Sequence, residues 1–204
     1  MTKKYELTQN SIKVNNRTLY QIRALKDFNF VKAGDLGGYI ETEKNLSHDN
    51  NCWVYGNAQV YGNAQVYGNA QVSENAQVYE NAEVFGNAWV YGHALVYRQA
   101  HVSGDVQVYG NAWVYENAHV HGNAHVYGNA QVYGNAQVSG SAQVYGNAQV
   151  YGKARLGYVP VNFNCDFDPY ESFKKILNQK EILPTLLGID SGLDKMISER
   201  LKHD

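Results

Sequence analysis

Cysteine and positive charge are both scarce in the central part of this 204-residue chain. The 2 cysteines, Cys52 and Cys165, are too few for a disulfide framework, which favours a reducing compartment. Of the 17 lysines and arginines, only Arg98 lies between Lys44 and Lys153, and this argues against a groove for nucleic acid there. No segment has the long apolar run of a membrane span or a signal peptide. We therefore expect a cytoplasmic protein that binds neither nucleic acid nor membrane.

Valine and alanine, by contrast, recur with a period of six residues from Val54 to Leu156. The repeated unit is Val-Tyr-Gly-Asn-Ala-Gln, and only Val106 replaces the alanine. Alternation along a short strand places valine and alanine on the inner side and glutamine and tyrosine on the outer side. Gly-Asn falls between strands, where a sharp corner needs a positive φ. Three such sides predict a triangular coil of about 18 residues that stacks on its neighbours.

This pattern resembles the hexapeptide-repeat proteins, which fold as left-handed parallel β-helices. The fold class that we predict is all-β: a single-stranded parallel β-helix of about seven triangular coils, whose left hand is implied by the resemblance. We expect an N-terminal β cap over residues 1–35, the β-helix over 36–157 and a C-terminal α-helical cap over 158–204. Alternating residues from Tyr5 to Leu25, on either side of Asn15-Asn16, predict a hairpin within the first cap.

Residues 36–53 form a degenerate first coil in this interpretation. Leu36 lies 18 residues before Val54, and the inward small positions hold Ile40, Leu46 and Cys52. The run from residue 33 to 41, with its continuation to residue 55, resembles the entry segment of hexapeptide-repeat proteins from bacteriophages and prophages. Some members of that group are labelled transferases from their fold alone, and the resemblance brings no established catalytic residues.

Residues 18 apart should stack vertically, so the outward positions divide into three faces. After each core valine, two of the faces carry mostly tyrosine. Stacked rings stabilise a parallel sheet by themselves, and tyrosine is also enriched in subunit interfaces. We predict a homo-oligomer, as members of the family are typically trimers, with the interface on the second face. The predicted interface residues are Tyr61, Tyr79, Tyr97, Tyr115, Tyr133 and Tyr151.

The third face departs from the tyrosine rule and carries a chemical cluster. His101 and His119 should be vertical neighbours, with His121 beside them on the same face. Three imidazoles could bind zinc or transfer protons, or they could be surface variations of a glutamine ladder. We predict a ligand site without metal or other cofactor. Its residues are Glu83, Phe85, His101, Ser103, His119 and His121.

Two classes of function compete for this sequence. The fold is often associated with acetyl-CoA-dependent acyltransferases, but those enzymes bury substrate beneath a loop that interrupts a coil, and no loop interrupts residues 54–156. We therefore favour a non-catalytic oligomeric protein that captures a planar, nucleotide-like molecule, since bases stack on aromatic faces. The phage-like resemblance suggests capture of a host signal or obstruction of a host defence protein. An acyltransferase, or a zinc site of the carbonic-anhydrase type, is the alternative.

Overall fold

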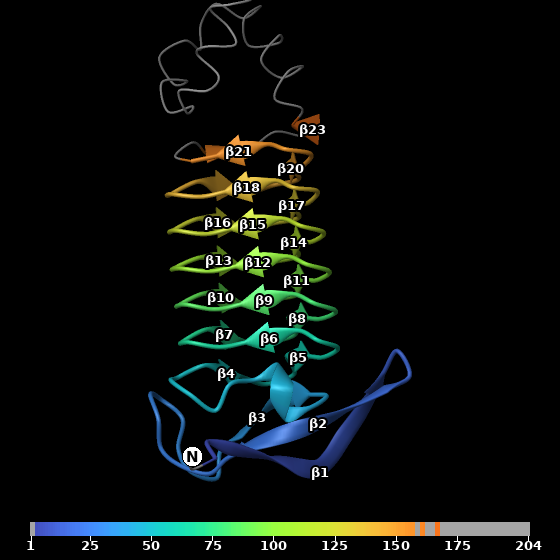
Figure 1. Ribbon diagram of the computed structural model, residues 1–204, viewed down its shortest axis with the longest axis vertical. Coiled ribbons are helices and arrows are strands. Elements are labelled where there is room, and N and C mark those ends of the chain that lie inside the picture. The colour runs from blue at the N-terminus through green and yellow to red at the C-terminus, as the bar shows by residue number, and fades with distance from the viewer. Residues whose placement is uncertain (1–2, 158–159, 162–165, 168–204) are drawn as a thin grey trace, which may run out of the picture.

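A computed structural model describes residues 3–157, 160–161 and 166–167. It is a parallel β-solenoid of about seven turns in which short strands stack into three sheets of ten, seven and six strands. Figure 1 shows the coils piled along the long axis, with a hairpin at the N-terminal end. The predicted all-β parallel helix is therefore confirmed, and its left hand stays a prediction.

Each side of the triangle contributes one sheet, and the three sheets correspond to the three predicted faces. The first sheet contains β4 (Trp53–Val54), β7 (Gln71–Val72), β10 (Trp89–Val90), β13 (Gln107–Val108), β16 (His125–Val126), β19 (Gln143–Val144) and β22 (Pro160–Val161). The second contains β1 (Tyr5–Val14), β2 (Arg17–Ala24), β3 (Leu36–Ile40), β5 (Gln59–Val60), β8 (Gln77–Val78), β11 (Leu95–Val96), β14 (Trp113–Val114), β17 (Gln131–Val132), β20 (Gln149–Val150) and β23 (Asp166–Phe167). The third contains β6 (Gln65–Val66), β9 (Glu83–Val84), β12 (His101–Val102), β15 (His119–Val120), β18 (Gln137–Val138) and β21 (Arg155–Leu156).

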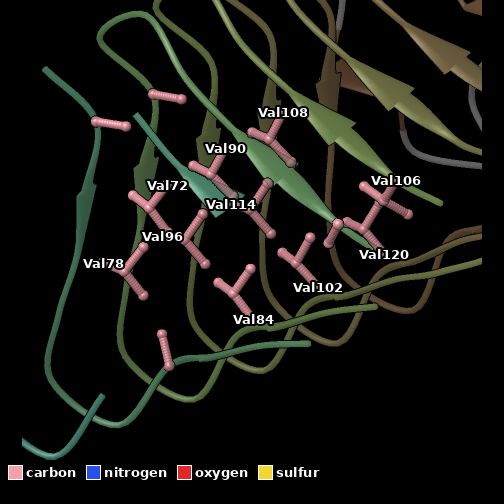
Figure 2. Close-up of a cluster of buried hydrophobic side chains, with 14 of the residues drawn as sticks. Val72, Val78, Val84, Val90, Val96, Val102, Val106, Val108, Val114 and Val120 are labelled. Carbon is pink, nitrogen blue, oxygen red and sulfur yellow. The ribbon is translucent and has the colours of Figure 1, made fainter. Parts of the chain in front are cut away.

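The interior is a dry column of valine and alanine. From Val72 to Val150 every core valine and alanine of the repeat has 0% of its surface exposed, and Val106 is buried in the place of an alanine. Figure 2 shows part of this column, with the labelled valines from Val72 to Val120 pointing into the space between the sheets. At the corners the glycine position takes the positive φ, for example 70° at Gly110. From Val72 to Val150 the inward assignment of valine and alanine is confirmed.

The N-terminal hairpin is confirmed, and it does more than cover one end. β1 and β2 pair antiparallel around Asn15 and Asn16, whose φ angles are 46° and 62°. β2 then pairs antiparallel with β3, and β3 pairs in parallel with β5 of the next coil. The hairpin thus continues the second sheet beyond the end of the solenoid (Figure 1).

The register of the first coil differs from the prediction. Ile40 pairs with Val60 and Leu46 with Val66, so both take the role of a core valine, although we assigned them to the small position. Leu36, assigned inward, is 59% exposed. The frame shifts by two residues because the segment after Leu46 is longer than an ordinary corner. It contains the loop that surrounds Lys4.

Lys4 ties this loop to the N-terminus from a fully buried position. Its Nζ atom donates hydrogen bonds to the carbonyl oxygen of Cys52 at 2.8 Å and to Cys52 Sγ at 3.2 Å. Burial lowers the pKa of Lys4. Trp53, which the repeat places outward, is only 1% exposed, because the rings of Tyr5 and Phe28 pack edge-on against it at 6.0 and 5.3 Å.

The predicted C-terminal helical cap, residues 158–204, falls almost entirely outside the described residues, as does Cys165. Within the described part of the chain, the one helical element is the short 3-10 helix η1 (Glu43–Asn45). None of the described helical structure is long and apolar enough to cross a membrane.

Candidate functional site

Two of the outer faces follow one regular rule. Tyrosine rings stack coil upon coil with centroids about 5 Å apart, as between Tyr79 and Tyr97 at 4.9 Å and 4°. The hydroxyl group of a tyrosine donates to the glutamine of the next coil, for example from Tyr115 to Gln131 Oε1 at 3.2 Å. These tyrosines therefore stack and hydrogen-bond within their own chain, which by itself accounts for a ladder.

The predicted interface residues are not equally available. Tyr61 is only 4% exposed, and its hydroxyl group donates to Gln77 Oε1 at 3.3 Å. Its ring offers little surface to another subunit. The other five members of the predicted set are half-buried and lie in one column on the second sheet. They are Tyr79, Tyr97, Tyr115, Tyr133 and Tyr151.

The third sheet replaces the tyrosine and glutamine rule with a chain of acidic and imidazole groups. The hydroxyl of Tyr67 donates to Glu83 Oε2 at 2.9 Å, and the same oxygen lies 3.8 Å from His101 Nδ1. Phe85 stacks on Tyr67 with centroids 4.8 Å apart and planes 3° apart. Burial, followed by the hydrogen bond and the charge of Glu83, raises the pKa of Tyr67 to about 12.

His101 and His119 are vertical neighbours on the third sheet, as the spacing of 18 residues predicts. His101 and His119 pair in register, and their rings stack at 4.8 Å with planes 10° apart. Burial lowers the pKa of His119, and the charges of His101 and His121 lower it further. Ser103 follows Val102 on the half-buried outer side of β12, and His121 follows Val120 in an exposed position. The third sheet thus gathers all six predicted site residues on one face.

Zinc coordination finds little support in this arrangement. Among the described residues there is no group of three His, Cys, Asp or Glu side chains placed to hold a metal ion. His101 and His119 lie with their rings nearly parallel, which turns their ring faces, and not their nitrogen atoms, toward each other.

A concave feature that sequence reasoning missed lies at the N-terminal end of the third sheet. A pocket of about 360 Å³ is formed between η1 with the residues after it and strand β6. It is lined by Glu43, Lys44, Leu46, Ser47, His48, Gln65, Val66 and Tyr67. In the sequence, Thr42 and Asn45 indicate a capped turn at η1. Only the folded chain shows that this turn faces strand β6 across a pocket.

The lowered pKa of His119 predicts a dependence of stability on pH. The unfolded chain binds this proton more tightly than the folded chain does. The contribution of His119 to the free energy of unfolding is therefore fully present above the ordinary imidazole pKa of about 6.5, and it is lost as the pH falls through the lowered pKa of the folded state. We expect His119→Gln, which restores the ladder residue of Gln137, to reduce the loss of urea midpoint between pH 7.5 and pH 5. His93→Gln, at a corner outside the cluster, is the control. An equal loss in both variants would contradict this assignment.

Comparison with known proteins supports the repeat architecture. Five stretches match the family described as YdcK Beta solenoid repeat: residues 58–74, 64–80, 106–122, 130–146 and 142–158. A protein of Escherichia coli (strain K12) named "Uncharacterized acetyltransferase YdcK" is 50% identical over 40 residues, which are 20% of this chain. The matched stretch spans only 12% of that relative's length. Together with the three stacked sheets, these matches make the chain a repeat β-solenoid protein.

Proposed function

We propose that this protein is a non-catalytic binding protein that holds a small planar molecule on its third sheet. The observation that carries the proposal is the departure of this face from the rule that governs the other two. Breaking a local rule without a gain in packing is typical of functional sites. Here the departure supplies an aromatic face at Phe85, a carboxylate acceptor at Glu83 and imidazole groups at His101 and His119.

The absence of an assembled reaction centre favours binding over catalysis. Strands β4 to β21 follow one another without an inserted loop, so in this part of the chain no segment folds over the face to exclude water. Enzymes of the acyltransfer type bury the reacting atoms to strengthen electrostatic stabilisation. A flat face of stacked rings instead suits a ligand that is held by stacking and hydrogen bonds, at about 1–3 kcal/mol per stacked base.

Ligand retention tests the proposal directly. Protein purified from cells should carry a small molecule that native mass spectrometry detects and denaturation releases unchanged. Phe85→Ala and His119→Ala should each retain less of it than the unmutated protein, since each loses a contact on the third face. Equal retention by all three proteins would place the site elsewhere. If no nucleotide copurifies and none binds when it is added, nucleotide binding is refuted.

Acetyl transfer is the second candidate, and one observation favours it: the partial relative from Escherichia coli carries the name of an acetyltransferase. In that case His101 or His119 would act as the general base for an acceptor amine. Acetyl-CoA would then bind in calorimetry, and the double change His101→Ala with His119→Ala would abolish turnover. The binding proposal predicts neither result.

Self-association through the second sheet is part of the proposal, because a second subunit could add a wall to an otherwise flat face. Replacing Tyr79, Tyr97 and Tyr115 together by serine is expected to shift the mass in light scattering from a trimer to a monomer. The β-rich circular dichroism spectrum should persist, since the valine and alanine core is untouched. An unmutated protein that is already monomeric at micromolar concentration would contradict the trimer.

The biological setting that we propose follows from the entry segment, residues 33–41, and its resemblance to phage-encoded repeat proteins. Such a protein would capture a host signalling molecule or obstruct a component of host defence. In the first case the retained ligand would be a host metabolite, and in the second a host protein would copurify through the same face.

A further inference from the structure

The aromatic column of the third sheet ends at Tyr67 on its N-terminal side. Phe85 covers one face of the Tyr67 ring at 4.8 Å, and among the described residues it is the one ring stacked on Tyr67. The chain continues the sheet by one more rung, because Leu46 bridges to Val66 and Ser47 N donates to Val66 O at 2.9 Å. This is the pattern by which Tyr61 lies below Tyr79. Ser47 therefore occupies the rung below Tyr67.

A serine in that rung leaves the space of an aromatic ring unfilled. The pocket of about 360 Å³ is lined by both Ser47 and Tyr67, so the unfilled space opens to the outside. Its volume lies at the lower end of the usual range for small-molecule sites, about 300–1,000 Å³. The ring of Tyr67 fixes the geometry of an occupant, because Phe85, its neighbour in this column, lies parallel to it within 3°.

The wall opposite β6 is held in place by hydrogen bonds. The side chain of Asn45 is fully buried and donates to the carbonyl oxygens of Gly62 and Ala64 at 3.0 and 2.9 Å. Its own oxygen accepts from Thr42 N at 2.8 Å, which closes the cap of η1. The turn that carries Glu43 and Lys44 is thus fastened to the next coil, so the pocket is preformed.

The polar groups around the pocket determine which hydrogen-bonding groups a ligand must carry. Lys3 Nζ donates to Glu43 Oε1 at 2.6 Å and lowers the pKa of Glu43, so that this group is a carboxylate at neutral pH. His48 Nε2 lies 3.6 Å from the other carboxylate oxygen. An ionised carboxylate only accepts hydrogen bonds, and it keeps further lone pairs for a donor. Gln65 and Ser47 supply both donors and acceptors.

We infer that this pocket binds an amino-substituted heteroaromatic ring, such as a nucleobase, as the missing rung of the column below Tyr67. This inference rests on the proposed ligand-binding function, but it places the ring at the N-terminal end of the third sheet and not over His101 and His119. The ring stacks on the free face of Tyr67, and its amino group donates to Glu43. Lys44, exposed at the rim, faces any anionic group attached to the ring.

The test uses adenosine as the probe in isothermal titration calorimetry with the full chain. Ser47→Tyr introduces the tyrosine of the repeat into the empty rung and should weaken adenosine binding more than tenfold while it raises the unfolding midpoint. Tyr67→Leu should weaken binding by a similar factor. Tyr127→Leu is the matched control, because Tyr127 holds the same position in a column of the first sheet and stacks on Tyr109 at 4.9 Å. It should leave the affinity unchanged.

Two further measurements distinguish binding of the ring from binding of a phosphate, and the pocket below Tyr67 from a site over the histidines. Ribose 5-phosphate lacks the ring and should not bind, and if it binds as well as adenosine 5′-monophosphate, the site is a phosphate site and the inference is wrong. If adenosine binds equally to the unmutated protein, Ser47→Tyr and Tyr67→Leu but weakly to His119→Ala, the ligand lies over the histidines. The proposed function then stands and this site falls. No binding of adenosine to the unmutated protein also overturns the site.

Discussion

Replacing Val96 by aspartate is expected to lower the free energy of unfolding by more than about 4 kcal/mol. Val96 has no exposed surface and pairs in register with Val78 below and Val114 above it. A carboxylate there would lose its hydration inside an apolar column. Neutralisation by proton uptake would still leave an unpaired polar group.

The matched control adds the same charge to the same coil on its outer side. Gln99 is exposed at a corner, so Gln99→Asp should change the free energy of unfolding by no more than about 0.5 kcal/mol. Urea unfolding followed by circular dichroism measures both variants. Because each coil contacts only its neighbours, the Val96 variant could also unfold in two steps. A small, equal effect of both substitutions would show that the column is not dry.

Replacing Trp53 by alanine is expected to lower the free energy of unfolding by about 3–5 kcal/mol. The ring is 1% exposed and packs against Tyr5 and Phe28, so its loss leaves a cavity between the hairpin region and the first complete coil. Trp89 holds the same position of the first sheet and is 49% exposed. We expect Trp89→Ala to lower the free energy of unfolding by less than about 1 kcal/mol. Similar costs for both would mean that the N-terminal segment does not pack on the solenoid.

The six-residue period allowed most of the fold to be predicted. Valine and alanine alternate with polar residues so strictly that the inner and outer sides, the three faces and the vertical pairing of His101 with His119 all follow from counting. The turn at Asn15-Asn16 was equally clear, because few residues other than glycine and asparagine take positive φ readily. Local patterning and the folded chain agree at these positions.

The first coil and the pocket could not be predicted in the same way. Nothing in the sequence after Leu46 indicates that its corner is longer, so the frame was extrapolated backward and placed Leu36 inside. The burial of Trp53 depends on a chain segment, around Tyr5, that is distant in sequence. The pocket likewise needs η1 and β6 to be brought together, and no periodic signal reports such a contact.

The proposed function requires a planar ligand on the third sheet. A crystal structure of the full chain with bound adenosine tests it most directly. We expect the base on this sheet, parallel to the ring of Tyr67 and over Ser47, with its amino group at hydrogen-bonding distance from Glu43. A base over His101 and His119 would leave the proposed function standing and refute the pocket below Tyr67, whereas a base on another sheet, or none at saturating adenosine, would contradict both.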